Sequence, residues 1–130
     1  MLESSDFWAT IPAADLERAK AFFRDALGFT PLKETDQWVT YRSGTSVFQV
    51  YPTASAGTAR HTLGGWVVED LRATVDALRA RGVAFEEYDV PGLKTEDGIA
   101  QLGEVERAAW FKDSEGNILA ISEFLTDPLV

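Results

Sequence analysis

The order of predicted elements in this chain occurs twice, and this repetition limits the folds that the chain can adopt. Asp15 opens one helix-like segment and Asp70 opens another, 55 residues later. Apolar side chains recur at helical spacing after Asp15, and less regularly after Asp70. Aspartate is a favoured helix N-cap, and Gly28 and Gly82 stand where a helix typically ends. The two segments therefore predict two equivalent helices.

Extended segments surround each predicted helix in the same order. Residues 6–13 and 61–68 precede the helices, and residues 29–34 and 83–88 follow them. Each half closes with a hairpin, over residues 38–52 with a turn at Ser43-Gly44 and over residues 108–124 with a turn at 113–116. Each half thus reads β-α-β-β-β. We predict an α+β fold of two tandem βαβββ modules, whose curled mixed sheets surround a cavity. Repeat 1 covers about residues 5–54 and repeat 2 about residues 61–125 of a single domain, 1–130.

Composition excludes several classes of protein. The net charge of −9 argues against binding to nucleic acid, and no apolar run approaches the ~20 residues that span a membrane. Without cysteine the chain has no disulfides, so we expect a cytoplasmic protein. Residues 61–130 carry fourteen acidic and six basic residues, a net −8, and the acids are densest from Glu86 to Glu106. Such a field serves solubility or attracts a cationic small molecule.

Three stretches of the sequence resemble one known family: "IPAADLERAKAFFRDALGF", "VVEDLRATVDALRARGV" and "AAWFKDSEGNILAISE". They are similar to the vicinal oxygen chelate superfamily, which includes glyoxalase I, extradiol dioxygenases, fosfomycin-resistance enzymes and bleomycin-binding proteins. The W-F-x-D-x-x-G-N run that leads into the last strand is the most specific of these features. The resemblance implies the two-module fold and, commonly, a homodimer. It does not imply one chemistry, because this superfamily carries several.

The resemblance also implies where a metal ion would bind. Members generally hold one divalent ion through His, Glu or Gln on the first and last strands of each repeat. The matching positions here are Trp8, Leu63, Gln49 and Ala120, and only Gln49 can coordinate a metal. We therefore predict no metal or other cofactor. The alternative, one divalent ion held by His61, Gln49 and Asp6, lacks the carboxylate that Ala120 replaces.

His61 and the aromatic strand residues offer other candidates. His61 follows a small, polar linker, which favours an exposed and idle side chain over a proton-transfer role. Most strand aromatics are expected to be core, but Trp8 is placed on the concave face. The segment "EEYDVPGLKTEDGIA", residues 86–100, is read as an irregular loop, either a solvated connector or a lid. The candidate ligand-binding residues are Trp8, Gln49, Tyr51, Leu63, Tyr88, Leu93, Lys94, Asp97, Trp110 and Ala120.

The function that these features favour is metal-independent binding or sequestration of a small molecule, cationic or aromatic, as in bleomycin-resistance proteins. One alternative is a metal-dependent enzyme of the glyoxalase or dioxygenase type, acting as a lyase or transferase. A second alternative is a metal-free enzyme whose acid or base is a carboxylate in the pocket. No residue is assigned a catalytic role. We expect a ligand site formed by the residues named above, and the resemblance implies a homodimer.

Overall fold

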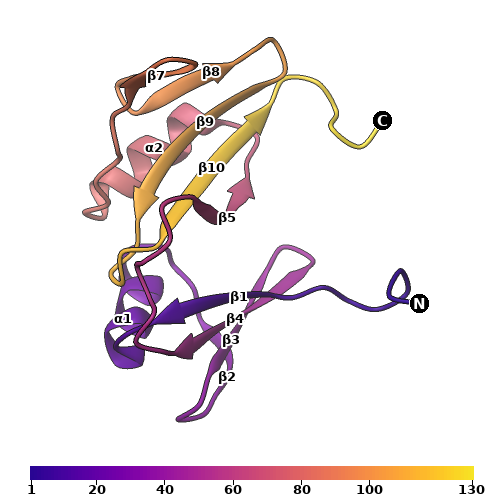
Figure 1. Ribbon diagram of the computed structural model, residues 1–130, viewed down its shortest axis with the longest axis vertical. Helices are drawn as coiled ribbons and strands as arrows, with labels where there is room; N and C mark the ends of the chain where they lie inside the picture. Colours follow the sequence, from indigo (N-terminus) through magenta and orange to yellow (C-terminus); the bar gives the residue numbers. More distant parts are fainter. The chain divides into compact units, whose positions relative to one another are not determined.

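The computed structural model describes all 130 residues and divides the chain into two compact units (Figure 1). The first unit contains residues 1–58 and, from the second half of the chain, the turn of residues 114–117. The second unit contains residues 59–113 and 118–130. None of the helices has both the length and the apolar character needed to cross a membrane.

The first unit is a four-stranded sheet with one helix. Its elements are β1 (Ala9–Ala13), α1 (Leu16–Asp25), β2 (Pro31–Glu34), β3 (Val39–Ser43) and β4 (Ser46–Pro52). The strand order is β1-β4-β3-β2, with β1 parallel to β4 and the other pairs antiparallel. Phe23 of α1 is fully buried and stacks on Tyr41, with ring centroids 5.4 Å apart. The aromatic side chains of the helix and the inner sheet face thus form the core of this unit.

The second unit repeats this plan with a larger sheet. Its elements are β5 (Thr62–Val67), α2 (Leu71–Ala80), β6 (Asp89–Val90), β7 (Leu93–Glu96), β8 (Ile99–Leu102), β9 (Glu106–Lys112) and β10 (Ile118–Phe124). The strand order is β5-β10-β9-β8-β7-β6, with β5 parallel to β10. The buried Leu71 and Val75 of α2 face the sheet side that carries Phe111, Leu119 and Ile121. Since strand side chains alternate, the intervening residues of β9 and β10 point to the other face.

Both predicted helices are confirmed, with their capping residues. The carboxylate of Asp15 accepts a hydrogen bond from the Arg18 N–H, and that of Asp70 accepts one from the Ala73 N–H, each at 3.0 Å. Each satisfies one of the backbone donors that a helix start leaves without a partner. The α+β fold of two βαβββ modules, predicted from the repeat, is therefore confirmed.

The prediction for residues 83–102 was wrong in two respects. Residues 83–88 form no strand, and within them only Phe85 makes an isolated bridge, to Phe111. The strand that pairs with β9 on the side away from β10 is instead β8, which begins inside residues 86–100, the segment predicted to be an irregular loop. Asp97 and Gly98 both have positive φ, 53° and 82°, and connect Glu96 to its partner Ile99. Asp-Gly is a strong signal for a two-residue hairpin, and this was the feature that the loop interpretation overlooked.

Candidate functional site

The open face of the second sheet holds a cavity of about 340 Å³. Alternate residues of the central strands line it, because the residues between them face α2. Three small residues from three adjacent strands, Gly65, Ala108 and Ala120, lie on this face. The full lining is Thr62, Gly64, Gly65, Trp66, Val67, Leu102, Glu106, Ala108, Trp110, Ala120, Ser122 and Phe124. Small side chains among larger ones leave the space that a ligand needs.

Gly65 lets strand β5 lie close against β10. A Cβ atom added at Gly65 would overlap the carbonyl oxygen of Ala120 and would lie 3.1 Å from the Ala120 Cβ. Neither backbone can move away without disturbing the pairing of Gly65 with Ala120. The glycine pair in "TLGGWV" therefore has a packing reason at this position.

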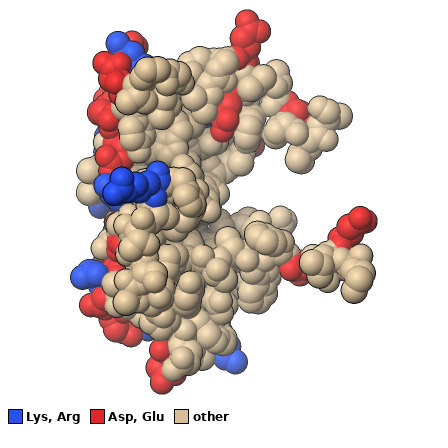
Figure 2. Space-filling model, viewed as in Figure 1, with Lys and Arg blue, Asp and Glu red and all other residues tan.

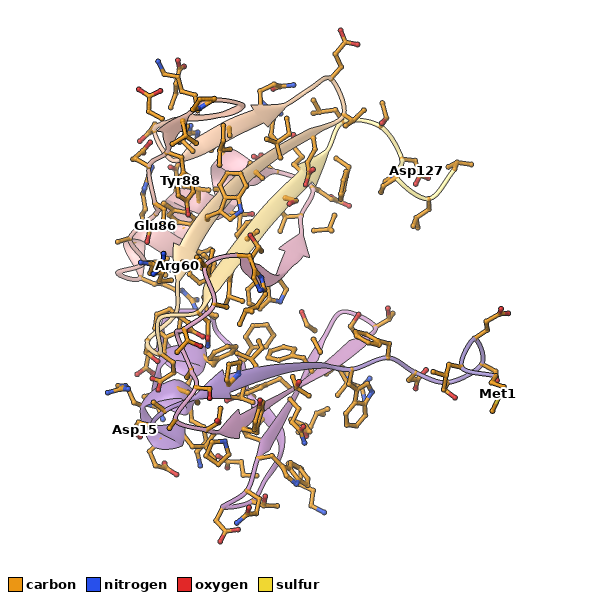
Figure 3. All side chains as sticks on the ribbon, in the orientation of Figure 1. Met1, Asp15, Arg60, Glu86, Tyr88 and Asp127 are labelled. Atoms are coloured by element: carbon orange, nitrogen blue, oxygen red, sulfur yellow. The ribbon has the colours of Figure 1, made fainter.

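Aromatic and aliphatic side chains form the sides of the cavity. Trp110 packs edge-to-face against Tyr88, with centroids 5.6 Å apart and ring planes at 77°. Burial raises the pKa of the Tyr88 hydroxyl, and the nearby Glu86 adds to the effect, so the hydroxyl stays protonated at neutral pH. Figure 3 shows both Tyr88 and Glu86 in the segment that leads into β6. Tyr88 thus supports Trp110, which itself lines the cavity.

Trp66 has a different role from Trp110. Its ring stacks on the fully buried ring of Phe111, with centroids 6.3 Å apart and planes at 12°. Phe111 lies on the sheet face that α2 covers, so the indole of Trp66 packs into the core and contributes little aromatic surface to the cavity. Trp66 also pairs with the buried Ile121, which lies on the same α2-covered face of the sheet.

Glu106 is the only ionisable residue in the lining of this cavity. It is half-buried, and its neighbours across the sheet are Leu102 on β8 and Phe124 on β10. No lysine, arginine or histidine nitrogen lies within 4.0 Å of its carboxylate. The cavity therefore has one negative charge on a largely apolar wall, together with the hydroxyls of Thr62 and Ser122.

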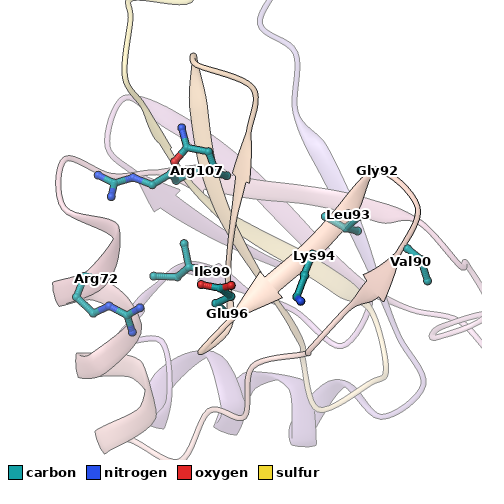
Figure 4. Close-up of a pocket in the computed structure, with 9 residues that line it drawn as sticks. Arg72, Val90, Gly92, Leu93, Lys94, Glu96, Ile99 and Arg107 are labelled. Atoms are coloured by element: carbon teal, nitrogen blue, oxygen red, sulfur yellow. The ribbon is translucent and has the colours of Figure 1, made fainter.

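The predicted site residues of the second unit separate into two groups. Trp110 and Ala120 line the cavity, Tyr88 supports it, and Leu63 is half-buried outside the lining. Leu93 and Lys94 instead line a groove of about 630 Å³ beside α2 (Figure 4). The other residues of that groove are Arg72, Val90, Gly92, Glu96, Ile99, Gln101 and Arg107.

Asp97 belongs to the surroundings of that groove. Its carboxylate accepts a hydrogen bond from Arg72 at 2.9 Å and pairs with Arg79 at 3.1 Å. The β6–β8 segment was predicted to be either a connector or a lid. In the structure Leu93 and Lys94 line the groove, and Asp97 binds Arg72 and Arg79 of α2. Asp97 holds its hairpin turn against α2.

In the first unit, three predicted residues lie on or near the sheet face opposite α1. Gln49 of β4 is half-buried between Thr10 of β1 and Thr40 of β3. Tyr51 follows on the same face and is 38% exposed. Trp8 directly precedes β1 and is 47% exposed. All three side chains can be reached by a ligand.

The residues at the expected metal positions do not fit a metal ion. No group of three or more His, Cys, Asp or Glu side chains lies close enough to hold one. His61 is exposed, with Nδ1 3.0 Å from the carbonyl oxygen of Thr62, and Asp6 is also exposed. Ala120, which stands where a carboxylate ligand is expected, presents only a methyl group to the cavity.

Glu123 does not replace the missing carboxylate, because it points to the helix side of the sheet. It accepts a hydrogen bond from the backbone N–H of Leu71, at 3.0 Å, and another from Arg107. The Leu71 N–H first, and then Arg107, lower the pKa of this carboxyl group. Glu123 thus stabilises the start of α2, where a negative charge is favourable.

The W-F-x-D-x-x-G-N run proves to have a structural role in this chain. Glu115 accepts hydrogen bonds from the Asp15 N–H at 2.8 Å and from Arg18 at 2.8 and 3.0 Å. Asn117 donates to the carbonyl oxygen of Pro12 at 2.7 Å and accepts from the Gly57 N–H at 3.2 Å. Both side chains are buried within the first unit.

Sequence reasoning missed the cavity residues Glu106, Leu102, Ser122 and Phe124. A usable signal was present, because Ser122 and Phe124 share the strand parity of Ala120. Because Ala108 pairs with Ser122 and Glu106 pairs with Phe124, these two residues of β9 lie on that same face of the sheet. The strand that contributes Leu102 was not predicted, and Glu106 was considered only as part of an acidic run.

Two comparisons with known sequences give different results. The sequence model described as Glyoxalase/Bleomycin resistance protein/Dioxygenase superfamily matches residues 7–121. A search of curated protein sequences found no match.

Many solved structures have a similar fold. A glyoxalase/bleomycin resistance protein/dioxygenase from Alicyclobacillus acidocaldarius is 17% identical, with a TM-score of 0.71 over 98% of this chain and 96% of that one. TnmS3, an antibiotic binding protein from Streptomyces sp. CB03234, is 20% identical, with a TM-score of 0.67 over 95% of this chain and 98% of TnmS3. FosX, a fosfomycin resistance protein from Listeria monocytogenes complexed with Mn(II) and sulfate, is 11% identical, with a TM-score of 0.67 over 91% of this chain and 88% of FosX. At these identities the likeness concerns the fold alone.

Proposed function

Because the chain belongs to the Glyoxalase/Bleomycin resistance protein/Dioxygenase superfamily, we propose that it binds a small organic molecule without a metal ion. The binding site is the cavity on the open face of the β5–β10 sheet. The observation that carries this proposal is Ala120 on the cavity wall, at the position where a metal-binding member would present a carboxylate.

The chemistry of the cavity suits a flat organic ligand. Trp110 and Phe124 offer aromatic rings, while Ala108 and Ala120 leave space between them. Pockets for small molecules are typically apolar, with a few polar groups that orient the ligand. The proposed function is then to hold or sequester the ligand. TnmS3, which has a similar fold, is described as an antibiotic binding protein. On the sheet face of the first unit, Trp8, Gln49 and Tyr51 are proposed as ligand-contacting residues of that unit by itself.

Tryptophan fluorescence tests this proposal directly. We expect one member of a panel of flat aromatic antibiotics to quench the fluorescence saturably in the presence of EDTA. Trp110→Ala should weaken that ligand about tenfold or more, since it removes a large contact surface. Trp38→Ala, which removes a half-buried tryptophan of the first unit, serves as the matched comparison. Binding that requires an added metal ion would contradict the proposal.

A second candidate function is a metal-free enzyme, and Glu106 is the observation that favours it. A carboxylate on an apolar cavity wall has the position that a general acid or base requires. The two functions differ in one measurable respect. Turnover of a bound ligand in EDTA that is lost in Glu106→Gln would favour the enzyme, whereas recovery of unchanged ligand favours the binder.

We further propose that the protein acts as a homodimer. Strands β1 and β5 are edge strands of their respective sheets. Exposed apolar side chains lie beside these edges, including Trp8 and Val67, and unpaired edges tend to be covered. Light scattering after size exclusion should give twice the chain mass of 14.3 kDa. A monomer at micromolar concentration would contradict this part of the proposal.

A further inference from the structure

We propose that Glu106 makes the cavity selective for positively charged ligands, so that the ligand is a flat aromatic molecule carrying a cationic nitrogen. The inference rests on the proposed binding function and adds the charge class of the ligand. Four observations lead to it: the place of Glu106 in the sheet, its lack of a basic partner, the distribution of basic residues, and the aromatic rings on the same face.

Glu106 occupies a position where its charge is only partly solvated. Leu102 and Phe124 stand directly across from it on the two neighbouring strands and on the same face of the sheet. Side chains paired in this way have Cβ atoms about 4.5–5.5 Å apart. The half-buried carboxylate thus lies between two apolar groups, where an ionic attraction is less screened than in bulk water.

The carboxylate has no basic partner within the chain. No side-chain nitrogen of lysine, arginine or histidine approaches it within 4.0 Å. Its sequence neighbour Arg107 points to the opposite face, where it pairs with Glu123. The negative charge at Glu106 is therefore available to a bound cation.

The basic residues of the second unit gather away from the cavity. Of the six lysines and arginines in residues 61–130, three line the groove beside α2, namely Arg72, Lys94 and Arg107. Arg79 lies on the same side, paired with Asp97. In Figure 2 the left edge of the second unit carries blue atoms beside a larger number of red ones. No basic residue lines the cavity, so its potential is negative.

Aromatic rings complete a site for an organic cation. Phe124 is adjacent to Glu106, and Trp110 lies further along the same strand. A cation within about 6 Å of a ring centroid is attracted by the face of the ring. A cationic aromatic ligand gains both this attraction and the pairing with Glu106. A neutral ligand of the same shape gains only stacking, and an anionic one is repelled.

Three ligands of matched shape separate these contributions: N-methylacridinium (positive), acridine at mildly alkaline pH (neutral) and acridine-9-carboxylate (negative). Tryptophan quenching and calorimetry would measure their affinities for the full chain. We expect the cation to bind about tenfold more tightly than acridine, in line with one favourable partly buried ion pair, and the anion to bind most weakly. The preference should decrease as salt is added.

Glu106→Gln keeps the shape of the side chain and removes its charge. We expect it to bind acridine as the original protein does, while its preference for the cation falls to about twofold or less. Glu104→Gln is the matched control, because Glu104 is exposed, lies outside the cavity and makes the same change in net charge. It should leave the preference unchanged. Circular dichroism would establish that both variants fold.

The outcomes distinguish this inference from the proposed function. Equal affinity of the original protein for all three ligands, or a preference that survives in Glu106→Gln, contradicts the role of Glu106 and leaves the binding function in place. A preference lost equally in Glu104→Gln also contradicts it, because net charge then suffices. If none of the three ligands binds, the proposed function and this inference both fail.

Discussion

At the scale of single residues, the carboxylates of Glu115 and Glu123 each hold a helix start, whereas that of Glu106 in the cavity has no basic partner. Glu115 accepts hydrogen bonds from the Asp15 N–H and from Arg18. Glu123 accepts hydrogen bonds from the Leu71 N–H and from Arg107. Arg18 is the largest cause that lowers the pKa of Glu115 to about 2, with the backbone N–H of Asp15 and the Ser114 hydroxyl adding to it. Glu106 has no such partner.

Glu115→Gln should therefore reduce stability in a pH-dependent way. The pKa of Glu115 is about 2 when folded and about 4.5 in the unfolded chain, so its contribution is complete above about pH 4.5. It is lost as the pH falls from there towards about 2. We expect a loss on the order of 3 kcal/mol at neutral pH and a smaller loss at about pH 3. Urea unfolding at both pH values measures this difference.

The control for Glu115 is Glu17→Gln in the first turn of the same helix. Glu17 is 83% exposed and pairs only with Lys20, so its removal should cost about 0.5 kcal/mol or less. An equal effect of both substitutions at neutral pH would show that helix-end charge, rather than the buried network, sets the stability.

Ala120 is the residue at which cavity volume can be tested. Ala120→Leu adds three carbon atoms to the cavity wall, between Gly65 and Trp110. We expect ligand affinity to fall about tenfold or more, because the added side chain occupies the ligand's space, and the fold to remain. Fluorescence titration and a thermal melt report the two effects separately. Unchanged affinity for the ligand would place the binding site elsewhere.

At the scale of elements, the β7–β8 hairpin extends the second sheet beyond the first. The turn at Asp97-Gly98 needs two residues with positive φ, and the Asp97 carboxylate is held by Arg72 and Arg79 of α2. Because β8 takes the place beside β9, Leu102 reaches the cavity face next to Glu106. The geometry of one turn thus contributes to the ligand site.

Gly98→Ala tests the packing of this turn. An added Cβ would lie 2.9 Å from the Arg79 guanidinium and 3.2 Å from the Phe85 Cβ, in addition to the strain of a positive φ. Gly103→Ala is the matched control, since its φ is also positive and its Cβ would meet no atom within 4 Å. We expect Gly98→Ala to lower the free energy of unfolding by about 1 kcal/mol more than the control. Equal losses would mean that backbone strain alone matters.

At the scale of the whole molecule, the distribution of charge bears on the proposed function. The net charge of −9 is uneven, with −8 in residues 61–130, yet the acids do not converge into a metal site. Those that converge do so on arginines and on backbone N–H groups at helix starts. The acidic field is therefore consistent with the proposed preference for a cationic ligand.

Thermal melts with divalent ions test the proposed metal independence for the whole chain. We expect Ni²⁺, Zn²⁺, Mn²⁺ and Fe²⁺ at tenfold excess to leave the melting temperature within about 1 °C, because a ligand stabilises only the state that binds it. EDTA-treated protein is the control. A rise of several degrees with one ion, at one equivalent bound, would overturn the metal-independent function.

The sequence alone determined the two helices, their capping aspartates and the closing hairpins, because helical spacing, caps and turns are local signals. It also determined that Ala120 cannot be a metal ligand. Glu123 is an odd number of residues from Ala120 in the same strand, which places it on the opposite face. It did not determine which segment pairs with β9 on the side away from β10, because that pairing depends on the path of the chain in space.

Only the tertiary structure decided which strand pairs with β9, and hence that Leu102, Glu106 and Phe124 stand together. It also showed that Glu115 and Asn117, the conspicuous polar residues of the last turn, bind backbone groups about 100 and 60–105 residues away. Such contacts depend on the three-dimensional path of the chain. The composition of a ligand cavity is a property of that path, because its residues come from strands that are distant in sequence.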